Sequence, residues 1–198
     1  DRLRSRGLGD VYKRQVTTPY ENLHILPSSL DLAAAELEIS DKKGRESILK
    51  NALLPIKQYY DYIIIDCPPS LGLITTNALT ASDTFLVPIQ CEYYALEGLT
   101  QLMSTVRRIK RQYNNTIDIE GVLLTMYDGR LNLTQQVVEE VKKFFPRKVF
   151  KTVIPRGVRL SEAPSFGMPV IYYDKNCKGS ITYTELAKEI IAKERSYE

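Results

Sequence analysis

The sequence predicts an α/β fold in which a mostly parallel sheet carries helices on both faces. Short apolar runs alternate along the chain with longer segments whose apolar residues recur every three or four positions. The run Tyr62–Asp66 is almost continuously apolar before its final acid, as in a strand that is covered on both sides. The intervals between runs are long enough for helical crossovers, which favours parallel pairing.

The first half of the chain contains a strand, a helix, a strand and a short helix, expected over residues 22–29, 44–60, 62–66 and 73–81. Pro55 lies inside the first of these helices and is expected to kink it, because proline lacks a backbone donor. The run Tyr62–Asp66 is expected to be the buried central strand.

The second half continues the alternation. Strands are expected over residues 84–89, 120–126, 148–154 and 169–173, and helices over residues 99–111, 137–145 and 183–191. Pro88 is expected near the end of its strand, because proline cannot donate to a ladder. Thr182, followed by Glu185 three residues later, predicts a capping box for the last helix. Four basic residues lie on the outer side of the helix over 99–111, namely Arg107, Arg108, Lys110 and Arg111.

Composition excludes several kinds of site. Apolar residues make up 43% and charged residues 26%, as in ordinary soluble domains, and no run approaches the ~18 apolar residues of a membrane span. Cys67, Cys91 and Cys177 lie far apart without metal-ligand spacing, which indicates a reducing compartment. The only histidine, His24, lies in an expected strand and is interpreted as structural, so no catalytic triad can be built.

The first fifteen residues differ from the rest. The segment DRLRSRGLGDVYKRQ holds five basic and two acidic residues, has no initiator Met and shows no periodicity. It is interpreted as a non-native or disordered leader, with a native basic arm as the alternative. The remaining residues, 16–198, carry 22 basic and 22 acidic side chains, so overall charge gives no indication of a nucleic-acid partner.

An aspartate ends the apolar run in the segment YDYIIIDCPPSLG, residues 60–72. In phosphoryl-transfer sites such a carboxylate, the Walker B aspartate, holds Mg²⁺ directly or through a water. An aspartate that only caps the following helix is the alternative interpretation of Asp66. Asp128 and Pro155 also follow expected strands, so the three residues are expected to share one rim of the sheet, where ligands of such folds bind.

Four segments occur in a characteristic order, namely DYIIIDCPPSLGLITTNALTASD, CEYYALEGL, LLTMYDGR and TVIPRGVRLSEAPSFG. Together they resemble the ParA/Soj family of chromosome- and plasmid-partitioning ATPases, which are relatives of MinD. The resemblance extends from about Tyr20 to the C-terminus and implies a P-loop NTPase-like, doubly wound fold.

The resemblance also implies roles for five residues. Asp66 corresponds to the Walker B aspartate, which is expected to hold Mg²⁺ through water. Pro155 and Gly157 correspond to the adenine-contacting loop, which reads PRN in the family and PRG here, so the usual side-chain amide is absent. Arg130 and Arg159 correspond to arginines that bind DNA non-specifically.

The basic residues of the C-terminal half agree with a DNA surface. Between residues 141 and 161 there are seven basic residues and no acidic one. Such a cluster can neutralise phosphates without reading bases, although a solvated basic face is the alternative.

A P-loop is missing from the sequence, because no glycine begins a GxxxxGK[ST] pattern. The fold is therefore expected to be incomplete, with residues 16–198 forming the C-terminal two-thirds of a single ATPase domain. This chain is expected not to hydrolyse ATP, to bind ATP and Mg²⁺ poorly, and to be poorly soluble or partly unfolded because strand edges and apolar surface are exposed.

The resemblance implies that the full-length relative binds ATP–Mg²⁺, forms an ATP-dependent homodimer, binds double-stranded DNA and is stimulated by a ParB-type partner. The segment EYYALEGL is expected near the dimer interface, and the protein is expected in the cytoplasm on the nucleoid. One alternative is a non-catalytic DNA-binding fragment. Another is a MinD-like membrane-cycling regulator, which needs a basic amphipathic tail, whereas the tail AKEIIAKERSYE has mixed charge.

Overall fold

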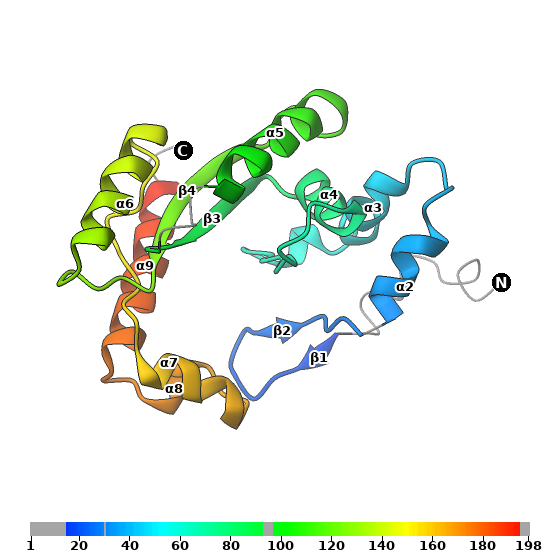
Figure 1. The fold of residues 1–198 in the computed structure, drawn as a ribbon. Coiled ribbons are helices and arrows are strands. Elements are labelled where there is room, and N and C mark those ends of the chain that lie inside the picture. Colours follow the sequence, from blue (N-terminus) through cyan, green and yellow to red (C-terminus); the bar gives the residue numbers. More distant parts are fainter. Residues whose placement is uncertain (1–14, 30, 93–96, 195–198) are drawn as a thin grey trace. The chain divides into compact units, whose positions relative to one another are not determined.

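The computed structural model describes residues 15–29, 31–92 and 97–194, whose elements are labelled in Figure 1. The chain divides into two compact units. Unit 1 comprises Asp1–Asp83 and Ser104–Ile117, and unit 2 comprises Thr84–Met103 and Asp118–Glu198.

Unit 1 contains a small hairpin and several short helices. In the hairpin, β1 (Val16–Thr17) pairs antiparallel with β2 (His24–Ile25), so the strand expected over 22–29 is reduced to two residues. The helices are α2 (Asp31–Glu38), η1 (Arg45–Ser47), α3 (Ile48–Leu53), η2 (Lys57–Tyr59), α4 (Leu73–Ala81) and the C-terminal part of α5 (Glu97–Gln112). The predictions of α4 and α5 are confirmed.

Pro55 breaks the helix that was predicted over residues 44–60 instead of kinking it. The segment forms three short helical pieces, and α3 ends at Leu53. Because Pro55 has no N–H to donate, the i→i−4 hydrogen bonds of α3 stop there. The next helical turn, η2, is a single 3₁₀ turn.

The strand predicted over Tyr62–Asp66 is wrong. No residue of this run has a ladder partner in the described part of the chain, and Ile64 is 91% exposed. An apolar run becomes a strand only when a neighbouring strand satisfies its backbone groups. Among the described residues no strand pairs with this run, so it is irregular and exposed.

Unit 2 is built on a parallel pair, β3 (Thr84–Gln90) and β4 (Asp118–Thr125), which lie side by side in Figure 1. Val122 and Leu124 of β4 join one buried cluster, and Leu123 joins another. Alternate residues of β4 are therefore buried on opposite faces, as expected for a parallel strand covered on both sides. The predicted α/β class is confirmed.

Helices cover both faces of β4. The first cluster contains Leu99 of α5 together with Val137 and Val141 of α6 (Asn132–Phe144). The second contains Leu186 of α9 (Lys178–Glu194). The predicted helices over 137–145 and 183–191 are confirmed.

Pro88 lies inside the paired part of β3, opposite Leu123, rather than at its end. Cys91 donates its N–H to Thr125 of β4, so by strand alternation the nitrogen of Pro88 faces away from β4. β3 has no ladder partner on that other side among the described residues, so the missing donor interrupts no hydrogen bond there.

The segment expected as a strand over residues 148–154 follows β4 but is interrupted. Phe150 donates to Val122 O at 3.0 Å and Ile154 donates to Leu124 O at 2.9 Å. Between them, the N–H groups of Lys151 and Thr152 donate to Glu189 of α9. A side chain therefore replaces the ladder in the middle of the segment, which leaves only isolated bridges.

The strand predicted over residues 169–173 is wrong, because the segment forms the helix α8 (Val170–Tyr173). Pro169 precedes it as N-cap, and its carbonyl accepts the N–H groups of Tyr172 and Tyr173. A short apolar run is ambiguous between strand and helix, and the local hydrogen bonds decide the outcome here. The helical turns α7 (Val158–Glu162) and η4 (Ala163–Phe166) precede α8 and were not predicted.

The predicted capping box of the last helix is also wrong. α9 begins at Lys178, so Thr182 lies in its second turn, and its hydroxyl donates to the carbonyls of Lys178 and Gly179. Threonine in a helix often bonds back to the preceding turn in this way.

Candidate functional site

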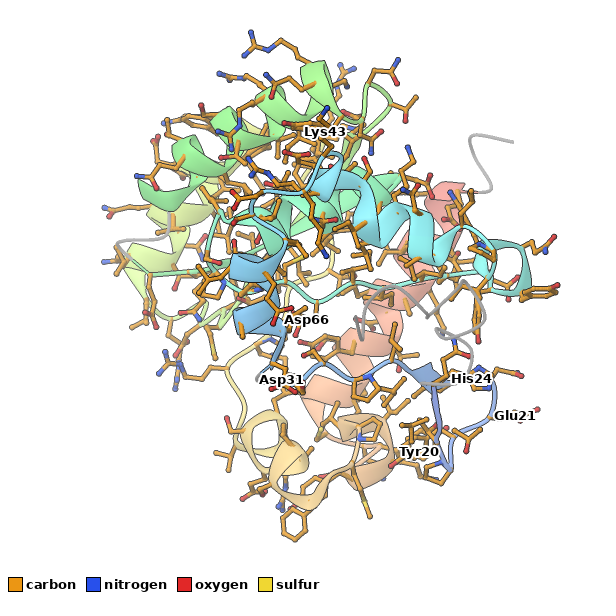
Figure 2. All side chains as sticks on the ribbon, turned by 90° about the vertical axis from the view of Figure 1, so that its right-hand side faces the viewer. Tyr20, Glu21, His24, Asp31, Lys43 and Asp66 are labelled. Atoms are coloured by element: carbon orange, nitrogen blue, oxygen red, sulfur yellow. The ribbon has the colours of Figure 1, made fainter. Side chains whose placement is uncertain are left out.

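Asp66 lies in unit 1 between η2 and α4, and its side chain is exposed (Figure 2). Within the described residues it accepts no hydrogen bond and forms no ion pair. The first N–H of α4, that of Leu73, donates instead to Glu36, so Asp66 does not cap that N–H. An exposed carboxylate without a protein partner is available to a cation or to a metal-bound water.

Glu36 of α2 holds the start of α4. Its Oε1 accepts the N–H of Leu73 at 2.6 Å, and a Cβ at Gly72 would lie 2.5 Å from the same oxygen. A side chain at residue 72 would therefore displace Glu36. The sequence analysis missed Glu36, because no local pattern links a residue of α2 to a helix 37 residues away.

Buried amides hold the rest of α4. Asn77 donates to Arg45 O at 2.8 Å and accepts the N–H of Leu49 at 3.1 Å. Asn114, just after α5, donates to Ser82 O at 2.7 Å. The helix that follows Asp66 is therefore tied at both ends to other elements of unit 1, which favours a defined position for the intervening loop.

The thiol beside Asp66 is not an activated nucleophile. Desolvation, followed by the negative charge of Asp66, raises the pKa of Cys67. Desolvation also raises the pKa of the buried Cys91. A raised pKa favours the protonated thiol, which is the less reactive form.

Arg130 forms a bidentate ion pair with Asp128 in unit 2, just after β4. Its Nε and Nη2 lie 2.9 and 2.7 Å from the two carboxylate oxygens. These hydrogen bonds lower the pKa of Asp128 to about 2. The Arg130 side chain is 88% exposed, so its remaining N–H groups face solvent and can donate to a further anion.

Pro155 and Gly157 lie at the same end of β4, because Tyr127 and Pro155 form a parallel bridge. Of the three residues expected to share a rim, the structure brings Asp128 and Pro155 together in unit 2, whereas Asp66 belongs to unit 1. Gly157 is the N-cap of α7 with extended backbone (φ −154°). A Cβ there would meet only Leu160, at 3.8 Å, so the position can accept a side chain.

Arg159 is held by acidic and aromatic neighbours. Its Nη1 lies 2.8 Å from Glu162 and its Nε 3.5 Å from Asp174, and its guanidinium lies 6.0 Å from the centre of the Tyr173 ring. The hydrogen bond to Glu162 is the main reason that the pKa of Arg159 is raised. This arginine is therefore partly neutralised within its own unit.

The basic stretch over residues 141–161 is not free of acids in space. Three of its other cations form ion pairs with side chains outside the stretch, namely Lys143–Glu140, Lys148–Asp118 and Arg156–Glu92, at 2.7, 3.0 and 2.7 Å. The local positive charge is therefore smaller than the sequence window indicates.

Two kinds of feature are absent from the residues that the structure describes. No three His, Cys, Asp or Glu side chains gather there as a metal site. In the same part of the chain, none of the helices is long and apolar enough to span a bilayer.

Comparison with known proteins identifies the family. A family profile described as an AAA domain matches residues 8–119. The sporulation initiation inhibitor protein Soj of Bacillus subtilis is 60% identical over 183 residues, which cover 92% of this chain and 72% of that protein. This chain belongs to the ParA/Soj family of partitioning ATPases.

A second ParA/Soj relative is the chromosome-partitioning ATPase Soj of Treponema pallidum. It is 49% identical over 178 residues, covering 90% of this chain and 70% of that protein. The general function predicted from the sequence, that of a partitioning ATPase, is therefore confirmed at the level of the family.

Solved structures confirm the P-loop NTPase-like fold of this ParA/Soj chain. Cobyrinic acid a,c-diamide synthase from Mycobacterium smegmatis, with bound ADP and magnesium, has a TM-score of 0.81 at 33% identity, covering 96% of this chain and 71% of that one. The cell division ATPase MinD of Pyrococcus furiosus has a TM-score of 0.72 at 23% identity, covering 95% and 76%. The second likeness concerns the fold alone.

Proposed function

We propose that this chain carries the Mg²⁺-side carboxylate, the adenine loop and a DNA-binding surface of a chromosome- or plasmid-partitioning ATPase. The observation that carries the proposal is Asp66, which is exposed and unpaired within the described residues and lies in the segment DYIIIDCPPSLG. The 60% identity to a Soj protein over 183 residues supports the same assignment.

Asp66 is proposed to bind the Mg²⁺ of a bound ATP, through water. Mg²⁺ in nucleotide sites keeps several waters and uses one or two carboxylates, which agrees with a single acidic side chain here. The metal neutralises charge on the phosphate oxygens when it is bound. Pro155 and Gly157 are proposed to contact the adenine through the backbone and the proline ring, because Gly157 offers no side-chain amide.

Arg130 and Arg159 are proposed to contact the phosphates of double-stranded DNA. Both are exposed enough to reach an anion, and phosphate contacts carry no sequence information, so binding would be non-specific. Each is already paired with a carboxylate, so we expect Arg130, whose free donors face solvent, to contribute more than Arg159.

The partner set follows from the family. We propose an ATP-dependent homodimer that acts in the cytoplasm on nucleoid DNA and is stimulated by a ParB-type protein. The relatives named as chromosome-partitioning proteins support this assignment.

The test of the nucleotide site is Asp66→Ala. The sequence has no GxxxxGK[ST] motif, so we expect the 198-residue chain to show no ATP turnover by itself. In a longer chain that supplies a P-loop, Asp66→Ala should lower kcat at least about 100-fold, measured by phosphate release, because one electrostatic contact to the transition state is lost.

Asp61→Ala is the matched control, because Asp61 is an exposed aspartate five residues earlier. It should leave kcat unchanged. Full activity of Asp66→Ala in the longer chain would contradict the role of Asp66. ATP turnover by the 198-residue chain that vanishes in Asp66→Ala would contradict the expectation that this chain is inactive by itself.

The missing motif favours a second function for the chain as given, namely DNA binding without turnover. Anisotropy of a labelled 30-base-pair duplex should then show the same affinity with and without ATP–Mg²⁺. An affinity that rises with ATP–Mg²⁺ would instead favour a nucleotide-competent chain.

A further inference from the structure

The C-terminal half of α5 carries an exposed group of cations that the proposed function does not use. Arg107, Arg108, Lys110 and Arg111 are all exposed, whereas Val106 and Ile109 of the same helix are 5% and 0% exposed. We call the four cations the α5 basic face. The buried residues anchor one side of the helix, so the basic face is fixed toward solvent.

The α5 basic face is unpaired, unlike the arginines proposed for DNA. Within the described residues none of its four side chains forms an ion pair or a side-chain hydrogen bond. By contrast, Arg130 is bound to Asp128 and Arg159 to Glu162. The face therefore keeps its full charge available for an external anion.

The arrangement within α5 is repulsive. Arg107 and Arg111 are four residues apart, and the pairs Arg107–Lys110 and Arg108–Arg111 are three apart, so like charges are neighbours on the helix surface. The helix dipole stabilises the positive charges of Lys110 and Arg111, which lie in the last turn of α5. Arg107 and Arg108 lie before that turn and lack this stabilisation. An anion placed over the face would relieve this repulsion.

The segment that contacts the end of α5 also carries cations. Tyr113, which directly follows the helix, donates to Glu46 Oε1 at 3.4 Å, which brings η1 to this end. Glu46 is paired with Arg45 at 3.2 Å, and the exposed Lys42 and Lys43 precede it (Lys43 is labelled in Figure 2). Glu46, the acid that Tyr113 contacts, is therefore already matched by a cation.

We propose that the α5 basic face binds the phosphate backbone of double-stranded DNA, through residues other than Arg130 and Arg159. From Arg107 to Arg111 the helix rises about 6 Å. Two phosphate steps along one DNA strand, at about 3.4 Å each, cover a similar length, so the spacing of these cations fits that of the phosphates. Exposed apolar side chains, which a membrane surface would require, are absent from the described residues 104–112.

The test is the salt dependence of DNA binding by the full 198-residue chain. The triple variant Arg107→Gln/Arg108→Gln/Arg111→Gln should bind a labelled 30-base-pair duplex more weakly and reduce the slope of log affinity against log salt by about 2.7, at about 0.9 for each lost phosphate contact. Single variants Arg107→Gln and Arg111→Gln should each reduce it by about one. Circular dichroism checks that the helix content is unchanged.

The matched control is Lys175→Gln/Lys178→Gln/Lys188→Gln, which removes three exposed cations from a different part of the chain. It should change the slope much less. An equal change in the control, or an unchanged slope in the α5 variants, would overturn the proposal. Loss of binding to polyglutamate with no loss of DNA binding would assign the face to an acidic protein and also overturn it.

The proposal shares DNA binding with the proposed function, but the two can fail separately. If Arg130→Ala and Arg159→Ala leave the slope unchanged while the α5 variants reduce it, the proposed DNA residues fail and the α5 basic face stands. The opposite result removes the α5 basic face alone.

Discussion

Gly157 and Gly179 both lie against Leu160, but they differ in the room they leave. A Cβ at Gly157 would be 3.8 Å from the Leu160 side chain, whereas one at Gly179 would be 2.7 Å from it. Gly157 also has extended backbone at a helix N-cap, where asparagine is favoured over glycine. The departure from the family's PRN loop at this residue is therefore not required by packing.

We expect Gly157→Asn to leave the free energy of unfolding within about 0.5 kcal/mol of the parent chain, because an N-cap asparagine satisfies an N–H without a clash. Gly179→Asn is the control and should destabilise the chain by about 1–3 kcal/mol through overpacking against Leu160. Urea unfolding followed by circular dichroism measures both. A Gly157→Asn variant as unstable as Gly179→Asn would contradict this account.

At the scale of elements, the contact between α2 and α4 positions the loop that carries Asp66. Glu36 supplies a charged acceptor to the N-terminus of α4, which adds to the hydrogen bond because the helix dipole favours an anion there. The contact joins two short helices of which neither is long enough to be stable alone.

We expect Glu36→Ala to destabilise unit 1 by about 1 kcal/mol, the usual effect of losing a helix cap. The amide of Leu73 should exchange faster with deuterium, because its acceptor is removed. Glu38→Ala removes an exposed acid of the same helix and should change neither quantity. Unchanged exchange at Leu73 in Glu36→Ala would show that the contact does not hold α4.

At the scale of the whole chain, the two units differ in how well their apolar side chains are buried. Unit 2 buries apolar side chains on both faces of β4, whereas Ile63 and Ile64 of unit 1 are exposed. Large exposed apolar side chains such as these favour association between molecules.

The rates of amide hydrogen exchange should therefore differ between the two units. Amides that bond to β4, such as those of Phe150 and Ile154, should be strongly protected. The amides of Ile63 and Ile64, for which no ladder partner exists among the described residues, should exchange at close to the unfolded rate. Equal protection of both sets, measured by NMR, would show that the run 62–66 is paired after all.

The sequence could predict the helices that have a long apolar stripe and the strands that have a pairing partner in the fold. α5, α6 and α9 have sustained helical stripes, and β3 and β4 have apolar runs with a real neighbour. The run 62–66 failed because pairing depends on another segment, and α8 failed because Pro169 and local hydrogen bonds outweigh the apolar run.

Within the candidate site, the sequence placed Pro155 next to Asp128, but it also placed Asp66 at the end of a strand that does not form. It could not predict the ion pair of Arg159 with Asp174, because this contact depends on the turn that returns α8 to α7. The pair with Glu162 is an i,i+3 contact within α7, a helix that was not predicted. The roles of Asp66, Pro155, Gly157, Arg130 and Arg159 in binding remain predictions.

Glu189 gives the chain a means of limiting aggregation. Its two oxygens accept the N–H groups of Lys151 and Thr152 at 2.8 and 2.9 Å. Burial raises the pKa of Glu189, but these hydrogen bonds lower it more, so the pKa lies below its ordinary value. Amides that are occupied by an anchored carboxylate cannot recruit the backbone of another molecule. Fibril-like growth should therefore be blocked at this segment, and any intermolecular stacking should begin elsewhere.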